Sequence, residues 1–256
     1  MYNFNLTQEE LNLVKNLETK LGLSFRNKQL LIVALTHSSY VGKLKKMNRL
    51  VYTYERLEFL GDAVLELIVS DFLVRRYKKQ SEGILSATRA FLVNEQALAK
   101  TARRLGLYNY VFVGKSFISK LQKSDHVLSD ILESIIGAVY LDRGFRKSKQ
   151  FVIRIHLSRF DIYRIIRNKL FLDSKTRLQE LVQKLLKITP SYENRTIIKN
   201  NRILFTSCVK IQEVVVACAQ GATKLEAEFK AAAKTLDLLK NKKKLNKILE
   251  QKNVKN

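Results

Sequence analysis

The stretch that decides the fold of the first half of the chain is Glu55-Arg56-Leu57-Glu58-Phe59-Leu60-Gly61-Asp62-Ala63-Val64-Leu65. Its acids Glu55, Glu58 and Asp62 follow one another at i, i+3 and i+7, a spacing that places them on one face of a helix. The apolar residues that we expect on the opposite face are Leu57, Leu60, Val64, Leu67 and Ile68. Like charges on successive turns destabilise a helix by roughly 0.2–0.5 kcal/mol per pair. Either Arg56 together with solvent, or a divalent metal ion, would offset this repulsion.

A second acidic pair lies in an apolar run further along the chain. Asp130 and Glu133, again three residues apart, belong to Ser129-Asp130-Ile131-Leu132-Glu133-Ser134-Ile135-Ile136-Gly137-Ala138. A buried carboxylate without a partner is costly, so such acids are usually paired or bound to a metal. Two helices that each offer two carboxylates would form an all-oxygen site of the kind that Mg²⁺ prefers. The spacing alone leaves ion-paired or solvated carboxylates as the alternative.

The remainder of the first half also predicts helices joined by short loops. Apolar residues recur every three or four positions from residue 6 to about residue 151, and the clearest helices are predicted at 54–77, 86–105 and 127–141. Gly106 and the run Asp142-Arg143-Gly144 should end the last two. We therefore predict an all-α domain over residues 1–150. Residues 151–172 are expected to be a basic connector, with a basic helix that closes the first domain as the alternative. The segment either touches phosphates or is a solvated helix surface.

The pattern changes after residue 173 to a helix, three strands and a second helix. The predicted ranges are 176–186, 192–199, 203–211, 214–219 and 222–240, and the middle strand alternates Phe205, Ser207, Val209 and Ile211 with Thr206, Cys208 and Lys210. We therefore predict an α+β domain of α-β-β-β-α order over residues 173–241. The lysine-rich tail, 242–256, is expected to be flexible.

The composition points to a polyanionic partner. The 256 residues include 47 lysines and arginines against 23 acids, for a formal charge of +24. Nucleic acid is the first candidate partner and an acidic membrane surface the second, although a general enrichment in lysine would also raise the charge. The first ten residues lack the pattern of a secretory signal, and no apolar stretch reaches the ~18 residues of a membrane span. We expect a soluble, cytoplasmic protein.

Two residue types that often carry chemistry are interpreted here as structural. The histidines His37, His126 and His156 lie far apart in the sequence, and none has a catalytic context, so hydrogen-bonded structural roles are expected. Cys208 and Cys218 lie on neighbouring predicted strands, where their side chains could face each other. In a reducing compartment we expect them to be free thiols.

The run 55–65 closely resembles the signature of the ribonuclease III family. Further segments that match the family in order are Ala34-Leu35-Thr36-His37-Ser38-Ser39-Tyr40, Ser81-Glu82-Gly83, Arg89-Ala90-Phe91-Leu92-Val93 and residues 128–142. One departure follows Gly114-Lys115, where Ser116-Phe117-Ile118 stands in place of a second glycine and an acid. The likeness covers nearly the whole first half of the chain. It implies a helical, metal-dependent endonuclease domain for double-stranded RNA.

The resemblance also implies roles for individual residues. Glu58, Asp62, Asp130 and Glu133 would be the catalytic residues that hold Mg²⁺, with Mn²⁺ able to substitute. Glu55 and Glu82 would be accessory acids near the cleft. Phe59 would enter a socket on a partner subunit, and Gly61 would permit close approach at that dimer interface.

The second domain resembles a double-stranded-RNA-binding domain, through Asp173-Ser174-Lys175-Thr176-Arg177-Leu178-Gln179-Glu180-Leu181 and Gly221-Ala222-Thr223-Lys224-Leu225-Glu226-Ala227-Glu228. The residues expected to contact RNA are Gln179 and Glu180, at 2′-hydroxyls, and Thr223 and Lys224, at phosphates. Leu225 and Glu228 occupy positions that are often basic, and Lys199-Asn200-Asn201-Arg202 replaces the usual histidine-containing loop. We therefore expect this domain to bind RNA less tightly than is usual.

Together the resemblances imply an enzyme that acts as a homodimer, because each helical-domain site can cut only one strand. Hydrolysis would leave staggered ends with 5′-phosphates and 3′-hydroxyls, and the expected substrates are ribosomal RNA precursors and other structured transcripts. No membrane and no small-molecule cofactor are expected. The alternatives are a catalytically inactive relative that binds RNA, which the presence of all four acids disfavours, and a cationic RNA chaperone, which leaves the spacing of the acids unexplained.

Overall fold

A computed structural model describes residues 2, 4–46, 52–199, 202–212 and 214–239. The chain divides into two compact units, Met1–Ile166 and Arg167–Asn256. The predicted first domain ended at residue 150, but Phe151, Ile155 and Leu157 are buried in the first unit. Most of the predicted connector is thus part of that unit. The predicted tail, 242–256, lies outside the described residues, as do Asn200 and Asn201 of the basic loop.

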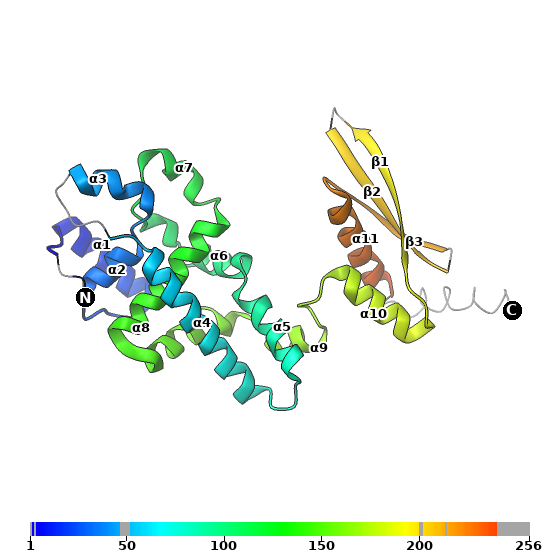
Figure 1. Cartoon of the computed structure of the whole chain (residues 1–256), viewed down its shortest axis with the longest axis horizontal. Helices are drawn as coiled ribbons and strands as arrows, with labels where there is room; N and C mark the ends of the chain where they lie inside the picture. The colour runs from blue at the N-terminus through cyan, green and yellow to red at the C-terminus, as the bar shows by residue number, and fades with distance from the viewer. Residues whose placement is uncertain (1, 3, 47–51, 200–201, 213, 240–256) are drawn as a thin grey trace. The chain divides into compact units, whose positions relative to one another are not determined.

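The first unit is all-helical, as predicted (Figure 1). Its α-helices are α1 (Gln8–Leu21), α2 (Lys28–Ala34), α3 (Val41–Lys46), α4 (Glu55–Arg76), α5 (Glu82–Val93), α6 (Glu95–Arg104), α7 (Ile118–Leu121), α8 (Asp125–Ile155) and α9 (Ile162–Arg167). Short 3-10 turns are η1 (Ser38–Tyr40), η2 (Leu107–Asn109), η3 (Lys115–Phe117) and η4 (Leu157–Arg159). None of the helices within the described ranges is both long and apolar enough to cross a membrane.

Helices α4 and α8 pack against each other along much of their length and form the centre of the unit (Figure 1). Two glycines allow their backbones to touch. A Cβ atom on Gly61 would lie 1.8 Å from the carbonyl oxygen of Glu133, and one on Gly137 would lie 2.2 Å from the carbonyl oxygen of Leu57. Since real Cβ atoms essentially never come so close to backbone, any side chain at either position would push the helices apart.

Two predicted helix ends differ from the structure. The helix predicted at 86–105 is two helices, because Asn94 is extended and its side-chain oxygen accepts the amide hydrogen of Ala97 to begin α6. The helix predicted to end at Gly144 continues beyond it. Gly144 adopts φ 74° and bends the chain, after which α8 resumes and Lys149 forms an ion pair with Asp71 of α4.

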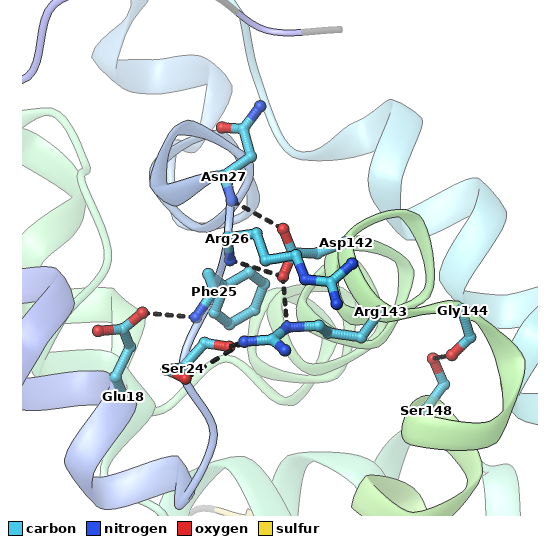
Figure 2. A network of polar contacts seen from close by, with 9 residues as sticks. All are labelled: Glu18, Ser24, Phe25, Arg26, Asn27, Asp142, Arg143, Gly144 and Ser148. Atoms are coloured by element: carbon cyan, nitrogen blue, oxygen red, sulfur yellow. Dashed lines mark hydrogen bonds and ion pairs between the residues drawn. The ribbon is translucent and has the colours of Figure 1, made fainter.

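The bend in α8 is fixed by a polar network (Figure 2). The Asp142 carboxylate accepts the backbone amide hydrogens of Arg26 and Asn27, each at 2.8 Å. Arg143 pairs with the same carboxylate at 3.0 Å and also donates to the carbonyl oxygen of Ser24. These bonds attach α8 to the segment between α1 and α2. They fix the position of α8 just before the bend at Gly144.

The second unit has the predicted α-β-β-β-α order. Helix α10 (Ser174–Leu186) is followed by strands β1 (Ser191–Lys199), β2 (Arg202–Ile211) and β3 (Val214–Gly221), which form one antiparallel sheet in sequence order, and by α11 (Lys224–Leu239). Both helices contribute to one core with the sheet (Figure 1). The predicted alternation is confirmed for Ser207, Val209 and Ile211, which are buried.

The prediction of free thiols is wrong in this structure. Cys208 of β2 and Cys218 of β3 are directly opposite in the strand register, with Cα atoms 4.0 Å apart, and they form a disulfide. Period-2 alternation predicts which face a cysteine occupies. It does not give the register between two strands, which is what brings the sulfur atoms together.

We expect Gly61→Ala to lower the free energy of unfolding of the first unit by about 3 kcal/mol, because the added methyl group would overlap the backbone of α8. Chemical denaturation followed by circular dichroism would measure the change. Gly83→Ala is the matched control. A Cβ there meets nothing within 4 Å, so the change should be neutral or stabilising by up to ~1 kcal/mol. Equal stabilities of the two variants would contradict the close crossing.

Candidate active site

The crossing of α4 and α8 brings acids of both helices together. Glu58 lies one turn before Gly61 on α4, and Asp130 and Glu133 precede Gly137 on α8. Each of the three offers a carboxylate oxygen, and these oxygens all lie within 4.8 Å of one another. We name Glu58, Asp130 and Glu133 the acidic cluster. It joins two segments that are more than seventy residues apart in the sequence, as the two acidic motifs predicted.

Asp130 is the most buried of the three, and both of its oxygens have donors. The hydroxyl of Tyr54 donates to Oδ2 at 3.1 Å, and Nδ1 of His126 lies 3.0 Å from Oδ1. The hydroxyl of Ser129 makes a longer contact, 3.4 Å, with the same Oδ1. This carboxylate is therefore held in one orientation.

Glu133 and Glu58 are in a different electrostatic position. Burial, together with the neighbouring charges of Asp62, Asp130 and Glu58, raises the pKa of Glu133 to about 8. Burial also raises the pKa of Glu58, as do the neighbouring charges of Asp130 and Glu55. Within the described ranges, no lysine or arginine is ion-paired with the acidic cluster. Crowded carboxylate oxygens without a lysine or arginine partner fit a hard divalent cation such as Mg²⁺.

The other predicted acids, Asp62, Glu55 and Glu82, lie outside the group of three. Asp62 is exposed and outside the group of three, although it is one turn beyond Glu58 and its charge acts on Glu133. Glu55 is the first residue of α4, and its charge raises the pKa of Glu58. Glu82 is not brought to the cluster within one chain. It begins α5 and lines a groove that also includes Val74 of α4. Val74 lies roughly 24 Å along α4 from Glu58, at about 1.5 Å per residue.

The two predicted interface residues have different surroundings. The side chain of Phe59 is 81% exposed, which is unusual for a phenylalanine and agrees with a role at an interface. Gly61 is packed against α8 of its own chain, and its predicted role at the dimer interface stays a prediction. Leu67, one of the apolar residues expected on the face opposite the acids, is 57% exposed and lies on the same side of α4 as Phe59.

Sequence reasoning missed Tyr54 and His126 as neighbours of the acidic cluster. His126 was taken as structural, yet it lies one turn before Asp130, and this i, i+4 spacing is the signal that could have identified it. No pattern identifies Tyr54, which reaches α8 only through the fold. His37 was expected to be structural, and its Nδ1 accepts the backbone amide hydrogen of Ser39. The fully buried His156 is bonded to Thr101 and to the carbonyl oxygen of Leu92.

In the second unit, the predicted RNA contacts are exposed at two places. Gln179 and Glu180 lie on α10, and Glu180 is ion-paired with Lys169. The hydroxyl of Thr223 accepts the amide hydrogen of Glu226 at the start of α11, and Lys224 is the exposed first residue of that helix. Thr223 therefore has a capping role that we did not predict.

Glu228, which we noted as a departure from a basic position, has a structural explanation. It is buried, pairs with Lys175 of α10 at 2.6 Å and accepts from Asn194 of β1 at 2.9 Å. These bonds join both helices to the sheet. A lysine at this position would lose both bonds and place a cation beside Lys175.

Comparison with known proteins gives the same two regions. Residues 27–160 match the model of the family described as Ribonuclease-III-like, and residues 174–239 match the double-stranded RNA binding motif. The chain is 36% identical over 243 residues to Ribonuclease 3 of Borreliella burgdorferi, covering 93% of this chain and 96% of that protein. It is 39% identical to Ribonuclease 3 of a Sulfurovum species, covering 90% of this chain and 100% of that protein.

Among solved structures, the nuclease domain of ribonuclease III from Campylobacter jejuni is similar to the first unit. The identity is 40%, the TM-score is 0.52, and the match covers 57% of this chain and 98% of that one. Its description refers to structural flexibility in a region involved in dimer formation.

We expect Glu133→Gln to stabilise the metal-free protein at pH 8 but to have little effect at pH 5. The folded protein keeps the Glu133 proton up to a pKa of about 8, whereas the unfolded chain releases it near the ordinary value of 4.5. Glu133 therefore causes the free energy of unfolding to fall as the pH rises between these two pKa values. A glutamine has no proton to release there, so Glu133→Gln removes this fall. Thermal unfolding in EDTA at the two pH values would measure it. A wild-type-like pH dependence in the variant would contradict the raised pKa.

Proposed function

We propose that this chain, which belongs to the ribonuclease III family and is an endoribonuclease specific for double-stranded RNA, hydrolyses its substrate with Mg²⁺ bound at the acidic cluster. The observation that carries the proposal is the meeting of three carboxylate oxygens within 4.8 Å. The catalytic residues in this proposal are Glu58, Asp130, Glu133 and Asp62.

The roles of these acids follow from their surroundings. Asp130 is oriented by its donors, so its carboxylate is already placed to act as a ligand. Glu58 and Glu133 hold protons more strongly than usual, and a bound cation would favour their ionised forms. Asp62 is exposed beside the cluster, where it can accept hydrogen bonds from water around the metal ion. Mn²⁺, which also accepts oxygen ligands, should substitute.

When bound, Mg²⁺ lowers the pKa of a coordinated water and neutralises charge on the phosphate oxygens. In the proposed reaction the water oxygen bonds to phosphorus and the bond from phosphorus to the 3′-oxygen breaks. The products are a 5′-phosphate and a 3′-hydroxyl. The carboxylates of this chain hold and orient the reacting groups.

Capture of RNA is proposed for the exposed residues of the second unit. Backbone N–H groups at the start of α11, with Lys224, are suited to phosphates, and Thr223 keeps this helix end in place through its capping bond. Gln179 and Glu180 on α10 are suited to 2′-hydroxyls in the minor groove. To contact a 2′-hydroxyl, Glu180 would have to break its ion pair with Lys169.

We further propose a homodimer formed through an apolar stripe on α4. Phe59, Leu67 and Val74 are 81%, 57% and 58% exposed, and they lie within about 80° of one another around the helix at 100° per residue. Large apolar side chains in a row on a surface usually mark an interface. Two copies would provide one cluster for each RNA strand.

A symmetric pairing with antiparallel α4 helices would also explain Glu82. The groove that contains Glu82 includes Val74, at the far end of the stripe from Phe59. An isologous contact places opposite ends of the two helices side by side. In that arrangement Glu82 of one copy would approach the acidic cluster of the other and could act there as the accessory acid.

The proposed substrates are ribosomal RNA precursors and other structured transcripts, processed in the cytoplasm. A double-stranded-RNA-binding domain recognises the shape of an A-form duplex over ~16 base pairs rather than its sequence. The duplex stems of such transcripts fit this requirement.

The proposed chemistry predicts that Glu133→Gln retains RNA binding but cuts a long RNA duplex about 100-fold more slowly or worse, because the loss of a charged ligand removes several kcal/mol of stabilisation. Cleavage of end-labelled RNA in Mg²⁺ and gel shifts in Ca²⁺ would measure the two properties.

Glu9→Gln, the same exchange at an exposed acid of α1, is the control and should leave both properties unchanged. Wild-type-like cutting by Glu133→Gln would remove this residue from the site. Cutting of duplex DNA by the wild-type protein would contradict specificity for RNA.

The proposed interface predicts that Phe59→Ala weakens dimerisation by about 2 kcal/mol, or roughly 30-fold in the dissociation constant, because an aromatic anchor is lost. Sedimentation over a dilution series would measure it. Ile203→Ala is the control, since Ile203 of β2 is 61% exposed and belongs to the second unit. If both variants dissociate at the wild-type concentration, Phe59 is not part of the interface.

A further inference from the structure

We propose that Tyr54 and His126 are positioning residues that hold Asp130 ready to bind the metal ion, one at each carboxylate oxygen. The inference rests on the proposed function, because it gives the two residues a role toward the cation of that site. Neither belongs to the set of acids that the sequence motifs identified.

Tyr54 connects two proposed ligands on different helices. Its hydroxyl donates to Oδ2 of Asp130 on α8, and its backbone carbonyl oxygen accepts the amide hydrogen of Glu58 on α4 at 2.9 Å. Its own amide hydrogen is bonded to the carbonyl oxygen of Thr36 at 3.0 Å. The buried residue Tyr54 therefore contacts both ligands: its backbone helps to form the first turn of α4, which carries Glu58, and its hydroxyl orients Asp130.

The ring of Tyr54 is packed against a second aromatic group that is itself held in place. His37 lies 5.6 Å from it, centroid to centroid, and stacks on Phe117 at 4.7 Å. The side chain of Ser39 bonds to His37 at 2.8 Å and to the amide of Gly114 at 2.9 Å. The Ser116-Phe117-Ile118 departure therefore supplies a ring that supports Tyr54 through His37.

His126 approaches Asp130 from within α8. Its Nδ1 lies 3.0 Å from Oδ1, while most of its side chain is exposed. A carboxylate has about four lone-pair positions on its two oxygens. Tyr54 uses one position on Oδ2, and His126 uses one on Oδ1, where Ser129 also makes its longer contact, so a position remains on Oδ2 for a cation.

Orientation matters here because the other two carboxylates repel Asp130. Glu58 and Glu133 lie in the same group of three. Without donors, the Asp130 side chain would lower its energy by rotating away from them, and the metal ion would have to turn it back. Donors that hold the ligating orientation remove part of this cost, and loss of such outer partners typically weakens metal affinity or activity by about 10–100-fold.

The experiment uses full-length Tyr54→Phe, which removes only the hydroxyl, and His126→Ala, with His126→Asn to restore a donor at the same place. The readouts are Mn²⁺ binding to RNA-free protein at constant pH by calorimetry, and kcat and KM for duplex RNA at saturating Mg²⁺. We expect Tyr54→Phe to weaken Mn²⁺ binding by about 10-fold or more. His126→Ala should weaken it less because His126 is exposed, His126→Asn should recover most of the loss, and KM for RNA should not change.

Tyr108→Phe removes a hydroxyl from η2 and is the control, with wild-type binding expected. If wild-type protein binds no Mn²⁺, the proposed metal site is wrong. If it binds and both Tyr54→Phe and His126→Ala bind equally well, the metal site stands and the positioning roles are wrong. Should Tyr54→Phe fail to fold, the His126→Ala and His126→Asn pair decides, and equal affinity in those two would overturn the role of His126.

Discussion

The contact between the backbones of α4 and α8 is the constraint on which the rest of the first unit depends. Carboxylates on two separate helices meet more readily when the helix backbones are in contact, and Gly61 and Gly137 allow that contact because they have no side chains. Glu58 precedes Gly61 on α4, and Asp130 and Glu133 precede Gly137 on α8. The site is therefore a consequence of how two helices pack rather than of a flexible loop, which favours a fixed geometry.

Such a site lowers the stability of the protein that carries it. A chain with a formal charge of +24 nevertheless gathers its acids at one place, with Glu133 buried enough to hold its proton to about pH 8. The same local negative charge would repel an RNA backbone. A cation in the cluster would relieve both problems, and basic groups elsewhere, such as Lys224, would attract the substrate toward a site that is by itself unfavourable to it.

Much of this could be predicted from the sequence because periodic patterns record which face of an element is buried. The spacing of Glu58, Asp130 and Glu133 indicated which acids share a helix face, the family resemblance implied that the two helices bring them together, and the three strands were placed to within a residue or two. What could not be predicted depends on contacts between elements. The packing of Gly61 against α8, the contact of Tyr54 with Asp130 and the pairing of Cys208 with Cys218 were not predicted, because neither the partner of a helix face nor the register of two strands is encoded in local periodicity. Asn94 and Gly144 show a related limit, since both interrupt a continuous apolar pattern through backbone conformation.

The bend at Gly144 restricts how this domain can change in length. Because the chain turns there, α8 contacts α4 twice: through the glycines near the acids, and through Lys149 with Asp71 near the other end of α4. Adding or removing one residue between these two points in either helix would rotate everything beyond it by about 100°. One of the two contacts would then be lost. Insertions and deletions should therefore be excluded from these two helical segments and confined to the loops, even where substitutions are tolerated.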